Sequence, residues 1–179
     1  MLDKLFKRTA PKAEKKRRYF FDIDGVLAVF NFDATQEDLL KEGYWINRPF
    51  HANMVRAAVF LILAGEEVYI LSARLEKAKT ALFEKNEWVD MILPMVSEDN
   101  RIFTLCGQDK VASIPSFDPD TDILIDDYGP NCRTWAEHGG RYVKVSVDSA
   151  DADIERTRHR SVVHPGMRPE EIAKIILEA

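Results

Sequence analysis

Residues 19–27 read Tyr-Phe-Phe-Asp-Ile-Asp-Gly-Val-Leu, an apolar run that contains two aspartates one residue apart. Side chains two positions apart in a strand point to the same face, so Asp22 and Asp24 can reach one small volume where the strand ends at Gly25. Two neighbouring carboxylates repel each other unless a cation or a shared proton lies between them. The pair therefore indicates either a shared proton or an oxygen-loving metal such as Mg²⁺. An ordinary acidic turn explains the same residues.

The composition is that of a globular protein with one core. The chain has 179 residues, of which 46% are hydrophobic and 31% charged, a length that suits one domain. No apolar run approaches the ~20 residues that a membrane-spanning helix needs. Charged residues also interrupt the N-terminus, which therefore does not read as a signal peptide. We expect a cytoplasmic protein with no membrane contact, in which Cys106 and Cys132 form no disulfide framework or zinc site.

Apolar strand-like runs alternate with helix-like segments along the chain. This order predicts an α/β fold with a parallel sheet, in which ligands bind beyond the carboxyl ends of the strands. After the first strand we expect strands at 66–72, 101–106, 122–127 and 141–146, the last being near a sheet edge, and helices at 50–64, 75–88, between Pro130 and Gly139, and at 169–177. The inner side of the helix at 75–88 is predicted to carry Ala78, Ala81, Leu82 and Phe83.

Further polar residues follow the later strands. Ser72 ends the second strand, where a hydroxyl can either hold a phosphate oxygen or cap a helix. A second acidic pair, Asp126 and Asp127, ends the strand at 122–127 and is most simply neutralised by the same Mg²⁺. Lys110 lies in the loop after the strand at 101–106, and it is either a solvated surface lysine or the residue that balances charge in a site.

These residues resemble, in order, the four motifs of the haloacid dehalogenase-like (HAD) hydrolases. The stretch Asp-Ile-Asp-Gly-Val-Leu at 22–27 resembles the first motif, Ser-Ala-Arg at 72–74 the second, Lys110 the third, and Ile-Asp-Asp-Tyr-x-x-Asn at 125–131 the fourth. The resemblance covers residues 18–146. It implies a Rossmann-like parallel sheet with helices on both faces, and a Mg²⁺-dependent phosphatase that forms an aspartyl-phosphate.

The resemblance also implies a role for each residue. Asp22 is expected to be the nucleophile and Asp24 the general acid and base, while Ser72 and Lys110 hold phosphate oxygens. The expected Mg²⁺ ligands are Asp22, the backbone carbonyl of Asp24, and Asp126. Asp127 is expected to bind the ion through water or to orient Lys110, and it can exchange roles with Asp126. The acid at position 24 implies a phosphatase rather than a dehalogenase.

Residues 28–49 are irregular and lie where HAD proteins often carry a cap insertion over the site, so we expect a small cap there. Its aromatic and cationic residues either pack internally or touch the leaving group of a substrate. The candidates for substrate contact are Tyr44, Trp45 and Arg48. Arg74 either binds the same phosphate or pairs with a surface acid.

The organisation expected from these patterns is a basic, flexible arm at 1–17, a hydrolase core at 18–148 and a C-terminal extension at 149–179 that ends in a helix. Residues 1–18 carry eight Lys or Arg against two acids, whereas the whole chain has a net charge of −5. Such an arm can contact nucleic acid, although a solvated leader is the simpler interpretation. The patterns do not indicate an oligomeric state.

Within the HAD phosphatases the sequence resembles the 5'(3')-deoxyribonucleotidase branch, which implies a small phosphorylated substrate, namely a nucleoside monophosphate. A phosphatase for another small ester, such as a sugar phosphate, is the first alternative. A non-catalytic module that binds nucleic acid or a protein partner is the alternative of another class.

Overall fold

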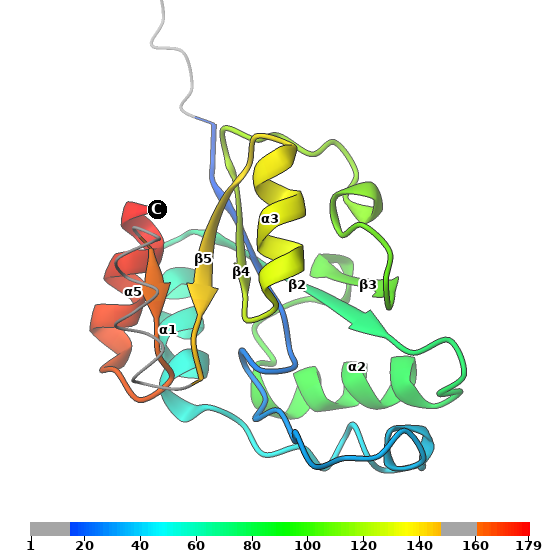
Figure 1. The fold of residues 1–179 in the computed structure, drawn as a ribbon. Coiled ribbons are helices and arrows are strands. Elements are labelled where there is room, and N and C mark those ends of the chain that lie inside the picture. The colour runs from blue at the N-terminus through cyan, green and yellow to red at the C-terminus, as the bar shows by residue number, and fades with distance from the viewer. Residues whose placement is uncertain (1–14, 148–160) are drawn as a thin grey trace, which may run out of the picture.

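The structure is a computed structural model of the chain, and it describes residues 15–147 and 161–179 (Figure 1). Most of the expected arm at 1–17, and residues 149–160 of the expected extension, lie outside these described residues. Within the described part of the chain, no helix combines the length and the hydrophobicity needed to cross a membrane.

The centre of the molecule is a six-stranded sheet in the order β3-β2-β1-β4-β5-β6. Every pairing of neighbouring strands is parallel, which confirms the expected α/β class. The strands are β1 (Arg18–Phe21), β2 (Glu67–Arg74), β3 (Arg101–Leu105), β4 (Asp122–Asp126), β5 (Arg141–Val145) and β6 (Val162–Val163). We expected the strand at 141–146 to be the last one. That was wrong, because β6 pairs with β5 and forms the edge of the sheet.

Alternate side chains of the central strands enter two hydrophobic cores, one on each face of the sheet. Tyr19 and Phe21 of β1 belong to the larger core, which also contains buried residues of three helices. Phe20, between them, points to the smaller core and packs beside Trp135. The helices that cover the larger core are α1 (Ala52–Leu63), α2 (Ala81–Ile92) and α5 (Pro169–Glu178), and α3 (Gly129–Glu137) covers the smaller core.

The expected helix at 75–88 was wrong in its bounds and in half of its inner side, because Ala78 and Ala81 are buried as expected but Leu82 and Phe83 are not. Residues 75–80 form turns, because Ala78 and Ala81 pack against Trp45 of the segment 28–49. Leu82 and Phe83, which we expected inside, are 41% and 65% exposed. Besides Ala81, the inner face carries Glu84, Lys85, Trp88 and Val89.

The segment 28–49 contains one short 3-10 helix, Asp38–Leu40, and is otherwise built of turns. The buried carboxylate of Glu84 on α2 fixes it by accepting hydrogen bonds from the backbone N–H groups of Gly43 (2.8 Å) and Trp45 (2.9 Å). The indole N–H of Trp88 donates to the backbone oxygen of Arg48 at 2.8 Å. Because the segment is irregular, side chains of α2 supply partners that a regular element would supply itself.

The order of strands changes direction between β1 and β4, since β2 and β3 lie on one side of this pair and β5 and β6 on the other. In open parallel sheets, ligands bind beyond the carboxyl ends of the strands at such a switch point. Arg18 and the buried Asp122 form an ion pair at the opposite ends of the two strands, with Nη2 and Oδ2 2.5 Å apart. A ligand-binding site is therefore expected at the carboxyl ends of β1 and β4.

The C-terminal helix α5 packs against α1, and its residues Ile172 and Ile176 are fully buried in the larger core. We expect Ile172→Ala to lower the free energy of unfolding by about 2–5 kcal/mol, because it removes buried methylene groups and leaves a cavity. Urea denaturation would measure this loss. Leu177 lies on the same helix and is 37% exposed, so Leu177→Ala should lower the free energy of unfolding by less than about 0.5 kcal/mol. Equal losses for the two variants would contradict the packing of α5.

Candidate active site

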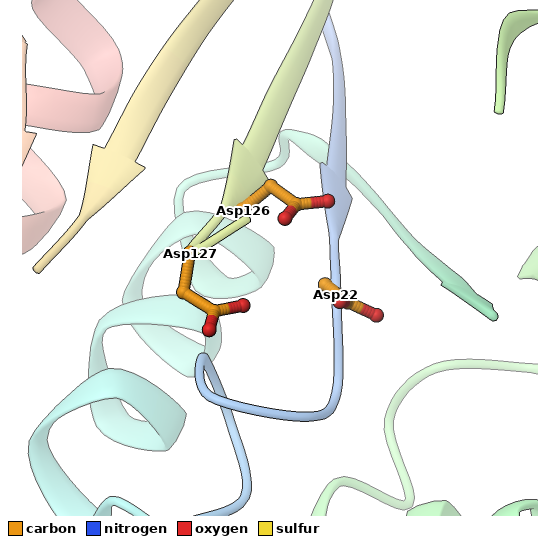
Figure 2. A group of neighbouring side chains, drawn as sticks. All are labelled: Asp22, Asp126 and Asp127. Atoms are coloured by element: carbon orange, nitrogen blue, oxygen red, sulfur yellow. The ribbon is translucent and has the colours of Figure 1, made fainter. Parts of the chain in front are cut away.

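The two acidic pairs of the sequence meet at the carboxyl ends of β1 and β4. Phe21 pairs with Ile125 in the sheet, so Asp22 and Asp126 occupy the next position of each strand line. Figure 2 shows the side chains of Asp22, Asp126 and Asp127 gathered there, and one carboxylate oxygen from each lies within 4.8 Å of the others. Residues about a hundred positions apart in the sequence thus form one acidic cluster.

Lys110 places a positive charge against this cluster. Its side chain is 3% exposed, and its Nζ lies 2.6 Å from Asp126 Oδ2 and 3.4 Å from Asp22 Oδ2. The ammonium also donates to the backbone oxygen of Leu71 at 2.9 Å. Burial alone would lower the pKa of Lys110, but the charges of Asp22 and Asp126 outweigh it and raise this pKa above its ordinary value. Lys110 is therefore a fixed cation. Its contact within the second acidic pair is with Asp126 rather than with Asp127.

Asp126 is held by several donors. The backbone N–H of Tyr128 donates to its Oδ1 at 2.7 Å, and the side-chain amide of Asn131 donates to its Oδ2 at 3.0 Å. Burial raises the pKa of Asp126, and the neighbouring Asp22 raises it further, against the lowering effect of Lys110. Asn131 was part of the fourth sequence motif, and the structure gives it the task of orienting Asp126.

The pKa of Asp127 is strongly raised. Burial raises its pKa to about 8, and the nearby Asp22 and Asp126 contribute to the rise. Its carboxylate lies against Gly25, where an added Cβ would come within 2.1 Å of Asp127 Oδ2. Gly25 also has a φ of +80°, which side-chain-bearing residues rarely adopt. The glycine of the first motif is thus needed both for the turn and for the room that Asp127 takes.

The donor set of this cluster fits a divalent cation. Carboxylate oxygens are the ligands that Mg²⁺ prefers, and the three side chains come from two rigid strand ends. Burial is the main cause of the raised pKa of Asp127, and repulsion from Asp22 and Asp126 adds to it; a bound cation would offset this cost. Asp22, Asp126 and Asp127 are the residues whose side chains could hold the ion. The side chain of Asp24 points elsewhere.

Asp24 contacts a second lysine, Lys85 of α2, which we had not singled out in the sequence. Lys85 Nζ lies 2.5 Å from Asp24 Oδ2, 3.2 Å from Ser72 Oγ and 2.5 Å from the backbone oxygen of Ala73. Ser72 is fully buried at the end region of β2. Lysines in a helix that is rich in charged residues are usually solvated, so the sequence carries no local signal for this one.

The expected cap residues are largely occupied by internal contacts. Trp45 is 7% exposed, and its ring lies 4.5 Å from Lys85 Nζ. Arg48 is also buried; its guanidinium donates to Tyr44 Oη at 3.0 Å and to the backbone oxygen of Val29, and Nη1 lies 3.9 Å from Asp24 Oδ1. Arg74 has a buried Nε with no hydrogen-bond partner among the described residues.

A cavity of about 570 Å³ opens beside Lys110. It lies between the loop that follows β3 and the first turns of α3. Its lining includes the side chains of Thr104, Gln108, Lys110, Tyr128, Asn131 and Thr134. This volume is within the range of small-molecule sites, and the amide and hydroxyl groups can form hydrogen bonds with a polar ligand.

Solved structures share this fold. A D,D-heptose 1,7-bisphosphate phosphatase from Burkholderia thailandensis matches with a TM-score of 0.62 and 13% identity, over 92% of this chain and 100% of its own. A haloacid dehalogenase-like family hydrolase from Streptococcus pneumoniae matches with a TM-score of 0.56 and 11% identity, over 89% of this chain and 97% of its own. At the level of sequence, no family model and no curated protein matches. The likenesses establish the fold of the chain.

The raised pKa of Asp127 predicts how the stability of the metal-free protein depends on pH. Between about pH 4 and pH 8 this carboxyl keeps its proton in the folded state and loses it in the unfolded state, so stability falls as the pH rises through this window. We expect a loss of at least about 1 kcal/mol between pH 5 and pH 8 in EDTA, measured by chemical denaturation, since one unit of pKa shift corresponds to about 1.4 kcal/mol.

Asp127→Asn should flatten this pH dependence, and Mg²⁺ should restore stability to the wild type at pH 8. Asp33→Asn, which changes an exposed aspartate outside the cluster, should leave the pH dependence as it is. The same slope in Asp127→Asn and in the wild type would show that Asp127 is not the group responsible.

Proposed function

We propose that this protein is a Mg²⁺-dependent phosphomonoester hydrolase of the HAD superfamily that acts through an aspartyl-phosphate on Asp22. The observation that carries the proposal is the convergence of Asp22, Asp126 and Lys110 at the switch point between β1 and β4. A carboxylate nucleophile, acidic metal ligands and a buried cation are the groups that phosphoryl transfer requires in one place. The shared fold with a phosphatase and a haloacid dehalogenase-like hydrolase is consistent with it.

In the first step Asp22 attacks the phosphorus, the bond to the leaving oxygen breaks, and Asp24 gives that oxygen a proton. Splitting the displacement into two steps in this way is the general advantage of covalent catalysis. Lys110 lies 3.4 Å from Asp22 Oδ2, which suits it to balance the negative charge that develops on the phosphoryl oxygens. Ser72 would hold another of these oxygens through its hydroxyl group.

In the second step Asp24 takes a proton from a water molecule, which attacks the phosphorus and breaks the bond to Asp22. The side chain of Asp24 suits this general acid and base role because it lies outside the group of three acids. Its position beside Lys85 and Arg48 keeps it on the side of the site that faces β2 and the segment 28–49.

Asp22, Asp126 and Asp127, together with the backbone carbonyl of Asp24, would hold the Mg²⁺. When bound, the ion supplies charge neutralisation and orientation of the phosphate. The raised pKa of Asp127 supports its inclusion in the ligand set.

For the substrate, we propose a nucleoside monophosphate, which makes the enzyme a 5'-nucleotidase of the deoxyribonucleotidase type. The cavity beside Lys110 offers Tyr128 for stacking and the amides of Gln108 and Asn131 for hydrogen bonds to a base or a sugar. Arg74 is a further candidate for contact with the substrate, since its buried Nε has no partner among the described residues. We place the enzyme in the cytoplasm, where nucleotides are available.

A sugar phosphate is the second candidate substrate. The hydroxyl and amide groups in the lining of the cavity can form hydrogen bonds with a polyhydroxylated leaving group, and one of the fold neighbours is a heptose bisphosphate phosphatase. A phosphate-release screen across nucleoside monophosphates and sugar phosphates would separate the two. A preference for the former in kcat/KM would support the nucleotidase.

Asp22→Asn should reduce Mg²⁺-dependent phosphate release from p-nitrophenyl phosphate by at least about 10³-fold, because the amide cannot act as the nucleophile. EDTA should abolish the wild-type activity, and Mg²⁺ should restore it. The measurement is the rate of p-nitrophenol formation by the purified chain.

Asp33→Asn is the matched control, because Asp33 is an exposed aspartate in the segment after the first motif. It should retain wild-type activity. Undiminished activity in Asp22→Asn would reject Asp22 as the nucleophile, and a wild-type chain without phosphatase activity would favour a non-catalytic binding module.

A further inference from the structure

Lys85 is buried at the centre of a set of contacts that the proposed reaction does not yet use. Lys85 is 1% exposed, although Phe83 and Glu87, two positions away on either side in α2, are exposed and partly buried, respectively. Its ammonium contacts Asp24, Ser72 and the backbone of β2, whereas Lys110 serves Asp22 and Asp126. The two buried lysines therefore serve different groups of the same site.

The chemistry of a lysine fixes the direction of these hydrogen bonds. An ammonium group only donates, so Ser72 Oγ must be the acceptor in its 3.2 Å contact with Lys85. The hydroxyl hydrogen of Ser72 is then left free to donate to another group. A serine that must hold a phosphate oxygen needs its hydrogen available in this way, and Lys85 provides that condition.

Lys85 also determines which oxygen of Asp24 can act. Its Nζ lies 2.5 Å from Asp24 Oδ2, so this oxygen is occupied. Asp24 Oδ1 is buried and has no hydrogen-bond partner among the described residues; Arg48 Nη1 lies 3.9 Å away. The side chain is thus held by one oxygen while the other remains available for proton transfer.

Contacts with the segment 28–49 hold Lys85 in its position. The neighbouring residue Glu84 accepts backbone hydrogen bonds from Gly43 and Trp45, and the ring of Trp45 lies 4.5 Å from Lys85 Nζ. An ammonium near an aromatic face gains a favourable cation–π interaction, which is stronger when the pair is buried. Helix α2 therefore anchors the segment 28–49 through Glu84, and it contacts Asp24 and Ser72 of the site through the next residue, Lys85.

We infer that Lys85 is a positioning residue of the proposed phosphatase. It holds Asp24 with Oδ1 free for proton transfer to the leaving group, and it keeps the Ser72 hydroxyl hydrogen available for the phosphate. This inference rests on the proposed function, because it gives Lys85 its task in that reaction. It adds a residue to the site that none of the four sequence motifs contains.

The test compares substrates whose leaving groups need a proton to different extents. Phenyl phosphate releases a basic phenolate that benefits from protonation by Asp24, whereas p-nitrophenyl phosphate releases a weakly basic phenolate that does not. We expect Lys85→Met to reduce kcat/KM on phenyl phosphate by about 10²-fold, the usual contribution of general acid catalysis, and on p-nitrophenyl phosphate by less than about tenfold. The comparison uses kcat/KM because this constant covers the release of the leaving group and not the second step, in which Asp24 acts as a base on the same intermediate for both substrates. A merely structural role would lower both by the same factor.

A double-mutant cycle with Asp24→Asn ties the effect to Asp24. In the Asp24→Asn background, Lys85→Met should cause little further loss on phenyl phosphate, since residues that act as a unit are non-additive. Lys79→Met, which changes an exposed lysine close to the start of α2, is the control and should have wild-type kinetics. Equal losses on the two substrates, or additive losses in the cycle, would overturn the inference.

Lys85→Met leaves Asp24 without its closest cation, so a thermal melt must show that the variant is folded at the assay temperature. If it is not, Lys85→Gln takes its place in the same comparison, because its amide removes the charge and keeps a donor. A wild-type chain that hydrolyses neither ester would reject the proposed function. An active wild type with a uniformly slowed Lys85 variant would reject only the role of Lys85.

Discussion

The neutralisation of negative charge at the carboxyl ends of β1 and β4 is the constraint on which the rest of the site depends. Three carboxylates gather there, and burial raises the pKa of Asp126 and Asp127, to which the charges of neighbouring acids add. Lys110 offsets part of this charge from within the protein by its contacts to Asp126 and Asp22. In the proposed function a bound cation would offset the remainder, so the charge that costs the fold stability is the charge that would hold the ion.

The positions of these acids could be predicted from sequence because each is tied to a strand end. The apolar runs at 19–21 and 123–125 lie in central, buried strands, and such strands read as continuous hydrophobic stretches. The parallel order of the sheet then brings their ends to one edge. The parallel arrangement was expected from the general rule for alternating strands and helices and from the resemblance to HAD hydrolases, and the structure confirms it. The order of the strands was not predicted.

The set of residues that α2 buries could not be predicted in the same way. Hydrophobic periodicity assigns charged residues to the outer face of a helix, but Glu84 and Lys85 are inside, and Phe83 is outside. Glu84 and Lys85 are buried because of their partners. Lys85 donates a hydrogen bond to Asp24, 61 residues away in the sequence, and Glu84 accepts one from the segment 28–49. The two-residue strand β6 escaped prediction for another reason, since it is too short to carry a periodic pattern.

The attachment of the segment 28–49 to α2 limits how far this segment can move without disturbing the site. Glu84 ties its backbone, Trp45 is buried, and Lys85 lies under the Trp45 ring on the adjacent position of the helix. Opening this segment as a hinged cover would break these hydrogen bonds and disturb Asp24 in the same movement. For the proposed phosphatase this arrangement favours a preformed site, in which the residues that line the cavity beside Lys110 would determine selectivity.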